Sequence, residues 1–229
     1  MRGIDAWREL VASRPEWWVV AVGLSSWGWI ARDVFARAAH AGHHGTSVGA
    51  DLLSWQVMVV AMMLPTLAMK TRDVALRCFA ERRDYSIAIF LAGYLVPWSL
   101  FGVAVLTLRQ LPWLQGPYSV VVSCAVATIW VTVPARARAM MSVYTYAPVI
   151  APDGWEATRD CVTAGLQVAA WCVASCWPLM LACAASGHDL AVVGVGGAIS
   201  LVESRSFRPP TRLVLAASAA LTVVVAIRA

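Results

Sequence analysis

The stretch GLQVAAWCVASCWPLMLACAASGHD, residues 165–189, is the most informative part of the sequence about the fold. It carries no acidic or basic side chain before its final His-Asp pair, and it lies in an apolar run over 161–186. A bilayer core of about 30 Å requires about 20 apolar residues in a spanning helix. The stretch therefore predicts a transmembrane helix.

The whole chain has the same apolar character. Of its 229 residues, 60% are hydrophobic and 14% are charged, and the mean hydropathy is +0.67. A soluble globular domain has about a quarter of its residues charged. The composition thus argues against a soluble enzyme, a nucleic-acid-binding protein and a disordered chain. It predicts an all-α polytopic transmembrane bundle whose partner is the lipid bilayer.

Six further apolar stretches have lengths that suit membrane helices. They run over 17–36, 52–69, 85–107, 117–134, 189–203 and 212–227. Residues 1–16 precede them as an amphipathic segment expected to lie in the membrane interface, with Ile4 and Trp7 at helical spacing. Residues 17–229 are expected to form a single transmembrane helical domain of about seven spans.

The charges of the loops predict the orientation. With a cytoplasmic N-terminus and all seven segments crossing, fourteen of the 18 Lys and Arg residues fall on the cytoplasmic side. Cytoplasmic loops carry an excess of basic residues. We therefore expect a multi-pass membrane protein with its N-terminus in the cytoplasm.

Small and aromatic residues give two predictions about helix packing. Gly194 and Ala198 form a small-xxx-small pair that would let their helix pack closely on a neighbour. Trp residues near the segment ends are expected to anchor the chain at the membrane interface. They are Trp17, Trp18, Trp55, Trp113 and Trp155.

The expected spans offer sulfur rather than charge for chemistry. No charged residue falls in the middle third of any span, whereas proton-coupled transport usually needs one. Cys172, Cys176 and Met180 follow one another at four-residue spacing, so they share one helix face. Thiolate and thioether are soft donors that suit Cu(I). The alternative interpretation is that these residues only fill the core.

Met58 and Met62 give the second apolar helix a similar stripe. Counted inward at about 1.5 Å per residue, Met58 lies level with Met180, and Met62 lies level with Cys176. A soft-metal site would form between the two helices if they are neighbours.

All four His residues fall on the outer side in this topology. His43 and His44 lie in one outer loop, and His188 follows the helix that carries Cys172. We expect these imidazoles to lie at the outer entrance to the row of thiol and thioether side chains between the two helices. We call this entrance the His mouth. Two short solvated loops are the alternative interpretation.

Three motifs, in this order, cover most of residues 50–205. They are Trp55-x-x-Met58-x-x-Ala61-Met62-Met63-x-Pro65, Gly93-Tyr94-Leu95-x-x-Trp98 and Gly165-Leu166-x5-Cys172-x3-Cys176-Trp177-x-Leu179-Met180, with Glu203 downstream. They resemble a bacterial family, the domain-of-unknown-function 2182 family of predicted metal-binding integral membrane proteins. The resemblance implies a polytopic protein of the bacterial inner (cytoplasmic) membrane that handles a soft metal.

The chain differs from that family's pattern at several positions. Ser175 stands where the family usually has a third Cys, and Met141 and Thr145 stand where it has a C-x3-C pair. His188-Asp189 replaces a Met-Asn. Loss of ligands with retention of the helical frame is typical of a repurposed structural subunit.

The favoured function is to bind or deliver a soft metal, copper. The expected ligands are Cys172, Cys176, Met180, Met58 and Met62, with His43, His44 and His188 at the mouth. A non-catalytic accessory or scaffold subunit of a larger membrane complex is the alternative, and a small-molecule transporter is the third. The sequence has no G-x-S-x-G, P-loop or H-E-x-x-H motif, so it offers no catalytic residues and favours a role other than that of an enzyme.

Overall fold

The fold is helical throughout the part of the chain that this computed structural model describes, residues 14–39, 48–110, 118–205 and 211–228. Its elements are α2 (Trp17–Ala39), α3 (Val48–Arg77), η1 (Ala80–Arg82), α4 (Arg83–Leu108), α5 (Tyr118–Thr132), α6 (Pro134–Thr145), α7 (Gly154–Ala185), α8 (Leu190–Arg205) and α9 (Thr211–Arg228). No strand occurs among these residues. The prediction of an all-α fold is confirmed, and the seven apolar segments correspond to α2, α3, α4, α5, α7, α8 and α9.

Three helical stretches in the described residues are long and apolar enough to cross a membrane: Gly49–Arg77, Ala80–Leu108 and Gly154–Ala185. The pair α5 and α6 gives a fourth span only if it is counted as one, and it is bent by 73°. The bend falls at Val133, which is extended because the following Pro134 disfavours a helical conformation there. The other predicted spans and the orientation of the N-terminus stay predictions.

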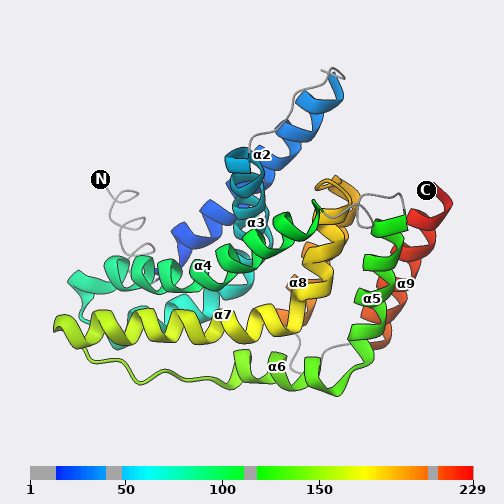
Figure 1. Cartoon of the computed structure of the whole chain (residues 1–229). Coiled ribbons are helices and arrows are strands. Elements are labelled where there is room, and N and C mark those ends of the chain that lie inside the picture. Colours follow the sequence, from blue (N-terminus) through cyan, green and yellow to red (C-terminus); the bar gives the residue numbers. More distant parts are fainter. Residues whose placement is uncertain (1–13, 40–47, 111–117, 206–210, 229) are drawn as a thin grey trace, which may run out of the picture.

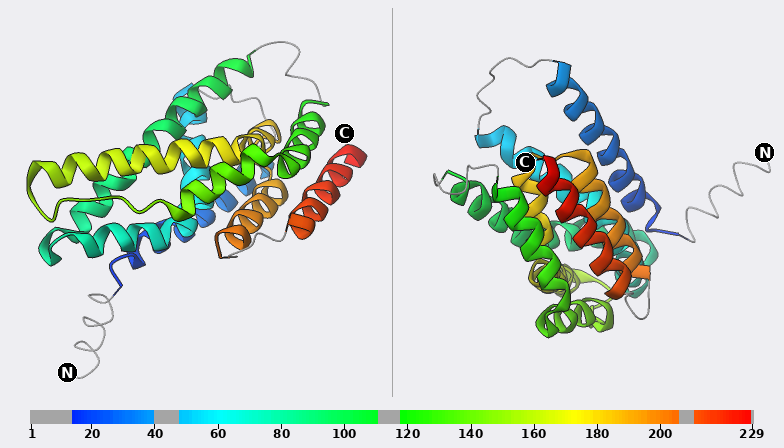
Figure 2. Two further views of the ribbon diagram at one scale, coloured as in Figure 1. Left: turned by 90° about the horizontal axis from the view of Figure 1, so that it is seen from below. Right: turned by 90° about the vertical axis from the view of Figure 1, so that its right-hand side faces the viewer.

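The two long helices α4 and α7 lie side by side and form the centre of the molecule (Figure 1). On one side α3 packs against α4, and it also contacts α2 and α8. At the C-terminal end of α7, α5 and α9 form an antiparallel pair that stands at a steep angle to α4 and α7, as the views in Figure 2 also show. The short helix α6 packs along α7.

Two glycines set the close approach of α4 and α7. A Cβ atom on Gly93 would lie 2.6 Å from the carbonyl oxygen of Val162, and one on Gly165 would clash with the carbonyl oxygen of Phe90. Neither position has room for a methyl group, so glycine allows the two backbones to touch. This contact brings Tyr94 of α4 against the face of α7 that carries Cys172.

Trp27 compensates for the proline inside α3. Pro65 has no N–H to donate to the carbonyl oxygen of Ala61, four residues earlier. The indole Nε1 of Trp27, on α2, donates a hydrogen bond to that oxygen at 2.9 Å. The bond satisfies the freed carbonyl and fixes α2 against α3.

The prediction that Trp55 anchors at the membrane interface is wrong. Its side chain is 0% exposed, and its Nε1 donates to the carbonyl oxygen of Trp98 at 2.9 Å. The ring lies against Gly102, where a side chain would clash with it. A tryptophan whose N–H finds an acceptor can be buried completely, and position near a segment end does not reveal that acceptor. Trp113 lies outside the described residues.

The close contacts of α8 are made at Gly196 and Gly197 and not at the predicted pair, Gly194 and Ala198. A Cβ on Gly197 would lie 2.8 Å from the ring of Trp27, and one on Gly196 would lie 3.0 Å from Cε of Met62. Nothing lies within 4 Å of such an atom on Gly194, and Ala198 is exposed. The prediction fails because spacing alone does not say which face of a helix meets its neighbours.

Candidate functional site

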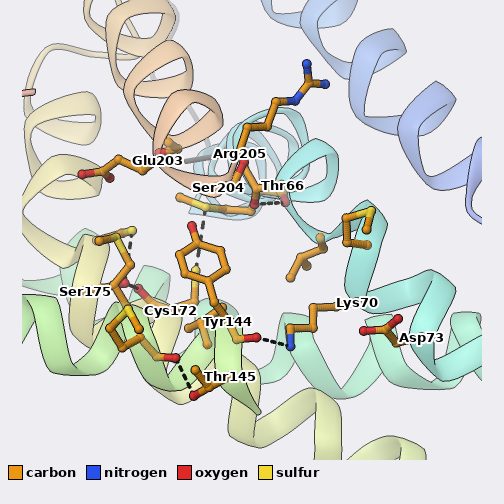
Figure 3. Close-up of a pocket in the computed structure, with 18 residues that line it drawn as sticks. Thr66, Lys70, Asp73, Tyr144, Thr145, Cys172, Ser175, Glu203, Ser204 and Arg205 are labelled. Atoms are coloured by element: carbon orange, nitrogen blue, oxygen red, sulfur yellow. Dashed lines mark hydrogen bonds between the residues drawn. The ribbon is translucent and has the colours of Figure 1, made fainter. Parts of the chain in front are cut away.

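A cavity of about 390 Å³ opens between α3, α6, α7 and α8 (Figure 3), and we call it the sulfur cavity. Six of its lining residues carry sulfur: Met63, Met69, Met140, Met141, Cys172 and Cys176. Lys70, Asp73 and Arg205 also line it, and the last two are exposed to solvent. The sulfur cavity therefore combines soft donors with a charged rim.

Cys172 and Met63 form the buried centre of the sulfur cavity. Their sulfur atoms lie 3.9 Å apart, and the residues are 7% and 1% exposed. The thiol of Cys176, one helical turn away on α7, interacts with that of Cys172. If a Cu(I)–S bond is given the Zn–S length of about 2.3 Å, two sulfur ligands at a trigonal angle lie about 4 Å apart. The observed spacing thus suits a shared metal ion.

Two hydroxyl groups contact the thiols. The phenolic O–H of Tyr94 donates a hydrogen bond to Sγ of Cys172 at 3.1 Å, and Oγ of Ser175 lies 3.4 Å from Sγ of Cys176. The Ser175 hydroxyl donates its proton to the carbonyl oxygen of Cys172 at 3.0 Å, so Tyr94 is the hydroxyl that donates to a thiol. A hydrogen-bond donor to a metal ligand holds it in position and favours its charged form. Tyr94 reaches its place through the close contact of α4 and α7.

A buried ion pair joins α6 to α8 beside the sulfur atoms. The guanidinium of Arg136 donates to both carboxylate oxygens of Glu203, at 2.7 Å and 2.6 Å. Both side chains are buried, and Glu203 lines the sulfur cavity. The two charges compensate one another, so the pair fixes α6 without leaving an uncompensated charge in the protein interior.

Lys70 holds the other end of α6. Its ammonium group donates to the carbonyl oxygens of Tyr144 and Tyr146, at 2.9 Å and 2.7 Å. Carbonyls at a helix C-terminus have no partner within the helix, and a cation satisfies them well. Figure 3 shows Tyr144 with Lys70 and Asp73 on one side and Glu203 on the other. Both ends of α6 are therefore fixed over the sulfur cavity.

The structure divides the predicted ligands among different places. Cys172 and Cys176 line the sulfur cavity, whereas Met180 is buried and does not line it. Met62 lies beside Gly196 of α8, and Met63 is the methionine that meets Cys172. One residue along a helix turns the side chain by about 100°, which directs Met62 and Met63 to different neighbours.

Met58 and His188 line a second, much smaller cavity. Its volume is about 10 Å³, room for no more than about one water molecule. His188 follows the left-handed Gly187 and is itself left-handed (φ 65°), and its N–H donates to the carbonyl of Cys183 at 3.0 Å. The two cavities share no lining residue. His43 and His44 lie outside the described residues.

The donor set of the sulfur cavity favours soft metals. Within the described ranges, no three His, Cys, Asp or Glu side chains gather as a metal site. The sulfur cavity instead joins two thiols to thioethers, which suit Cu(I) and are poor ligands for hard cations.

Sequence reasoning missed several residues of the sulfur cavity. Met63 lies in the first motif quoted above, but its neighbour Met62 has the better helical spacing. Met140 and Met141 lie on α6, outside the seven apolar stretches, so no spacing in the sequence places them beside Cys172. The positions at which the chain differs from the resembled family pattern could have identified this region. Ser175, Met141 and Thr145 are three of these positions, and all of them line the sulfur cavity.

The fold and the site define a helical protein with a soft-donor cavity. The chain belongs to a family of copper chaperones: the family PpoB2, described as a copper chaperone, matches residues 52–228. The matched region includes every residue that lines the sulfur cavity. No curated protein and no solved structure matches the chain. The expectation of a copper-related family is confirmed, and the resemblance to the domain-of-unknown-function 2182 family stays a prediction.

Proposed function

We propose that this chain binds Cu(I) in the sulfur cavity and hands it to a partner. The ligands are the thiolates of Cys172 and Cys176 and the thioether of Met63. The observation that carries the proposal is the 3.9 Å contact between Cys172 and Met63 in a cavity with four further sulfur side chains. The family description supports copper as the metal.

The sulfur atoms differ in exposure, which provides a route for transfer. Met63 and Met140 are buried, whereas Met141 and Met69 are 48% and 69% exposed. Copper binding releases the two thiol protons to solvent, and exchange of thiolate for thioether ligands moves the ion outward. Because thioethers carry no charge, they bind more weakly and can pass the ion to an incoming ligand.

The charged rim of the sulfur cavity suggests the side of the membrane on which copper is exchanged. Lys70 and Arg205 lie at ends of α3 and α8 that the distribution of basic residues predicts to be cytoplasmic. We propose that the sulfur cavity opens to the cytoplasm. We also propose that the His mouth on the outer side takes up copper. His188 is the residue of this mouth that lies in the described part of the chain.

We further propose that the chain is a multi-pass protein of the bacterial inner membrane with about seven spans. Large apolar side chains on its outer helices support this placement, because bulk water would leave them without apolar contacts. Phe35 on α2, Ile129 on α5 and Leu213 on α9 are each more than 60% exposed. A lipid environment or other membrane subunits would cover them.

The accessory-subunit alternative is favoured by Ser175 and Thr145. These hydroxyl groups line the sulfur cavity at positions where the resembled pattern has thiols. Under this alternative the chain would hold no copper and would act only through its apolar surfaces. The two functions therefore differ in the metal content of the purified protein.

The experiment compares copper content after purification in detergent under reducing conditions. The variants are Cys172→Ser/Cys176→Ser and, as a matched control, Cys124→Ser, which removes a buried thiol outside the sulfur cavity. We expect the double variant to hold one copper fewer per chain, with an affinity at the cavity lowered more than about 100-fold. Wild type and control should agree. Equal copper in the double variant and wild type would overturn the proposal.

A further inference from the structure

We propose that the sulfur cavity receives copper as the Cu(I) complex of a small anionic thiol, a molecule that carries both a thiol and carboxylate groups. This inference rests on the proposed function and adds the form in which the metal arrives. The sulfur cavity has about 390 Å³, within the range of about 300–1,000 Å³ typical of small-molecule sites. A single ion needs no more room than a water molecule, roughly 30 Å³ in the liquid. The cavity therefore has room for an organic ligand beside the metal.

A buried hydroxyl group in the cavity wall has no partner. Ser200, on α8, lines the sulfur cavity and is 7% exposed. Its Oγ has no hydrogen-bond partner in the described part of the chain. By contrast, the hydroxyl groups of Thr66, Thr145 and Ser204 line the same cavity and each donate to a carbonyl oxygen of their own helix. Because buried polar groups are normally satisfied, Ser200 is available to a polar group of an occupant.

The outer end of the sulfur cavity carries an excess of positive charge. Arg205 is exposed, has no ion-pair partner among the described residues, and extends away from Cys172 (Figure 3). The ammonium group of Lys70 has three N–H donors, and two of them bind carbonyl oxygens. Against these two cations stands one exposed carboxylate, that of Asp73, since Glu203 is already neutralised by its ion pair. The rim should therefore attract an anion.

The two ends of the sulfur cavity together define the chemical class of the ligand. Its inner end presents the thiols of Cys172 and Cys176, and its outer end presents cations. An occupant with a sulfur atom at one end and carboxylates at the other suits both. Thiolates are good ligands for Cu(I), and small thiols are kept reduced in the cytosol, the side to which we propose that the cavity opens.

Transfer from such a carrier is ligand exchange without a change of oxidation state. A Cys172 or Cys176 thiol loses its proton to solvent and forms a Cu–S bond. The Cu–S bond to one carrier thiolate breaks, and that thiolate takes up a proton from solvent. The copper stays Cu(I) throughout, and the freed carrier leaves as a neutral thiol group.

The first test measures binding of labelled reduced glutathione, a thiol with two carboxylates, to the copper-free full chain in detergent with a phosphine reductant. Equilibrium dialysis should find one molecule per chain. Arg205→Gln and Ser200→Ala should each weaken binding about threefold, and Asp73→Asn should strengthen it about threefold. Arg138→Gln removes an exposed arginine outside the sulfur cavity and should have no effect. Absence of binding, or equal binding by all variants, would overturn the inference.

The second test compares two carriers of Cu(I), the glutathione complex and the complex of the uncharged thiol 2-mercaptoethanol. Wild type should acquire copper faster from the glutathione complex, and Arg205→Gln should lose this preference while its final copper content stays that of wild type. Equal rates for the two carriers in wild type would overturn this inference but not the proposed function. The copper content of Cys172→Ser/Cys176→Ser decides that function separately.

Discussion

The sulfur cavity and the small cavity at His188 differ in size and chemistry, although the sequence predicts that residues from both form one continuous metal path. The first has about 390 Å³ and six sulfur side chains, and the second has about 10 Å³ with one methionine and one imidazole. Only the first has room for an ion with several ligands. The soft donors therefore gather where α6 covers α7, away from His188.

The difference arises from which face of α3 each methionine occupies. Met58 and Met63 are five residues apart, which is about 7.5 Å of rise and a rotation of about 140°. Met58 therefore faces His188, whereas Met63 faces Cys172. Substitutions at the two cavities can separate their roles.

The largest expected effect comes from breaking the ion pair that holds α6 over the sulfur cavity. Glu203→Gln leaves the guanidinium of Arg136 buried beside a neutral amide, and loss of one partner of a buried pair costs about 3–5 kcal/mol. The unfolding free energy in detergent should fall by this amount. The control Asp153→Asn, whose contact with Arg82 is solvent-exposed, should change stability only slightly. Equal losses in both variants would contradict the role assigned to α6.

The next effect distinguishes the two methionines. Met63→Leu keeps the volume of the side chain but removes the thioether next to Cys172, so the Cu(I) affinity should fall about tenfold, or about 1.4 kcal/mol. Met58→Leu should change it less than about twofold. Competition with a chelator measures both. If Met58→Leu weakened binding as much as Met63→Leu, the division into two cavities would be wrong.

The smallest effect concerns His188. Because His188 does not line the sulfur cavity, His188→Gln should leave the equilibrium Cu(I) affinity within about twofold of wild type. If the imidazole serves uptake from the outer side, the variant should load copper more slowly from that side in proteoliposomes. A large loss of affinity would instead make His188 a ligand of the main site.

Much of the fold could be predicted from the sequence because apolar segments are a local signal. The stretch over 161–186 and its six counterparts all became helices, since length and hydropathy suffice to recognise them. The packing could not be predicted in the same way. Gly196 rather than Gly194 contacts Met62, and Trp55 is buried, because both depend on which neighbour each helix face meets.

The candidate site was predicted in part for the same reason. Cys172 and Cys176 share a face of one helix, so their spacing alone was enough to place them together. Met63, Tyr94 and Met140 reach them from three other helices, and contacts between distant segments leave no periodic signal in one sequence. Lys70 was visible only as a charge near the end of a segment, and Glu203 only as a residue downstream of the third motif. Neither position predicts the contact with α6.

The most direct test is X-ray absorption at the copper edge of the full chain loaded with a single equivalent of Cu(I) under reducing conditions. We expect a first shell made of sulfur alone, at about 2.3 Å, a distance taken from the Zn–S bond, and no outer-shell scattering from imidazole. A first shell with nitrogen or oxygen ligands would contradict the proposed site, because the ion would then lie outside the cluster formed by Cys172, Cys176 and Met63.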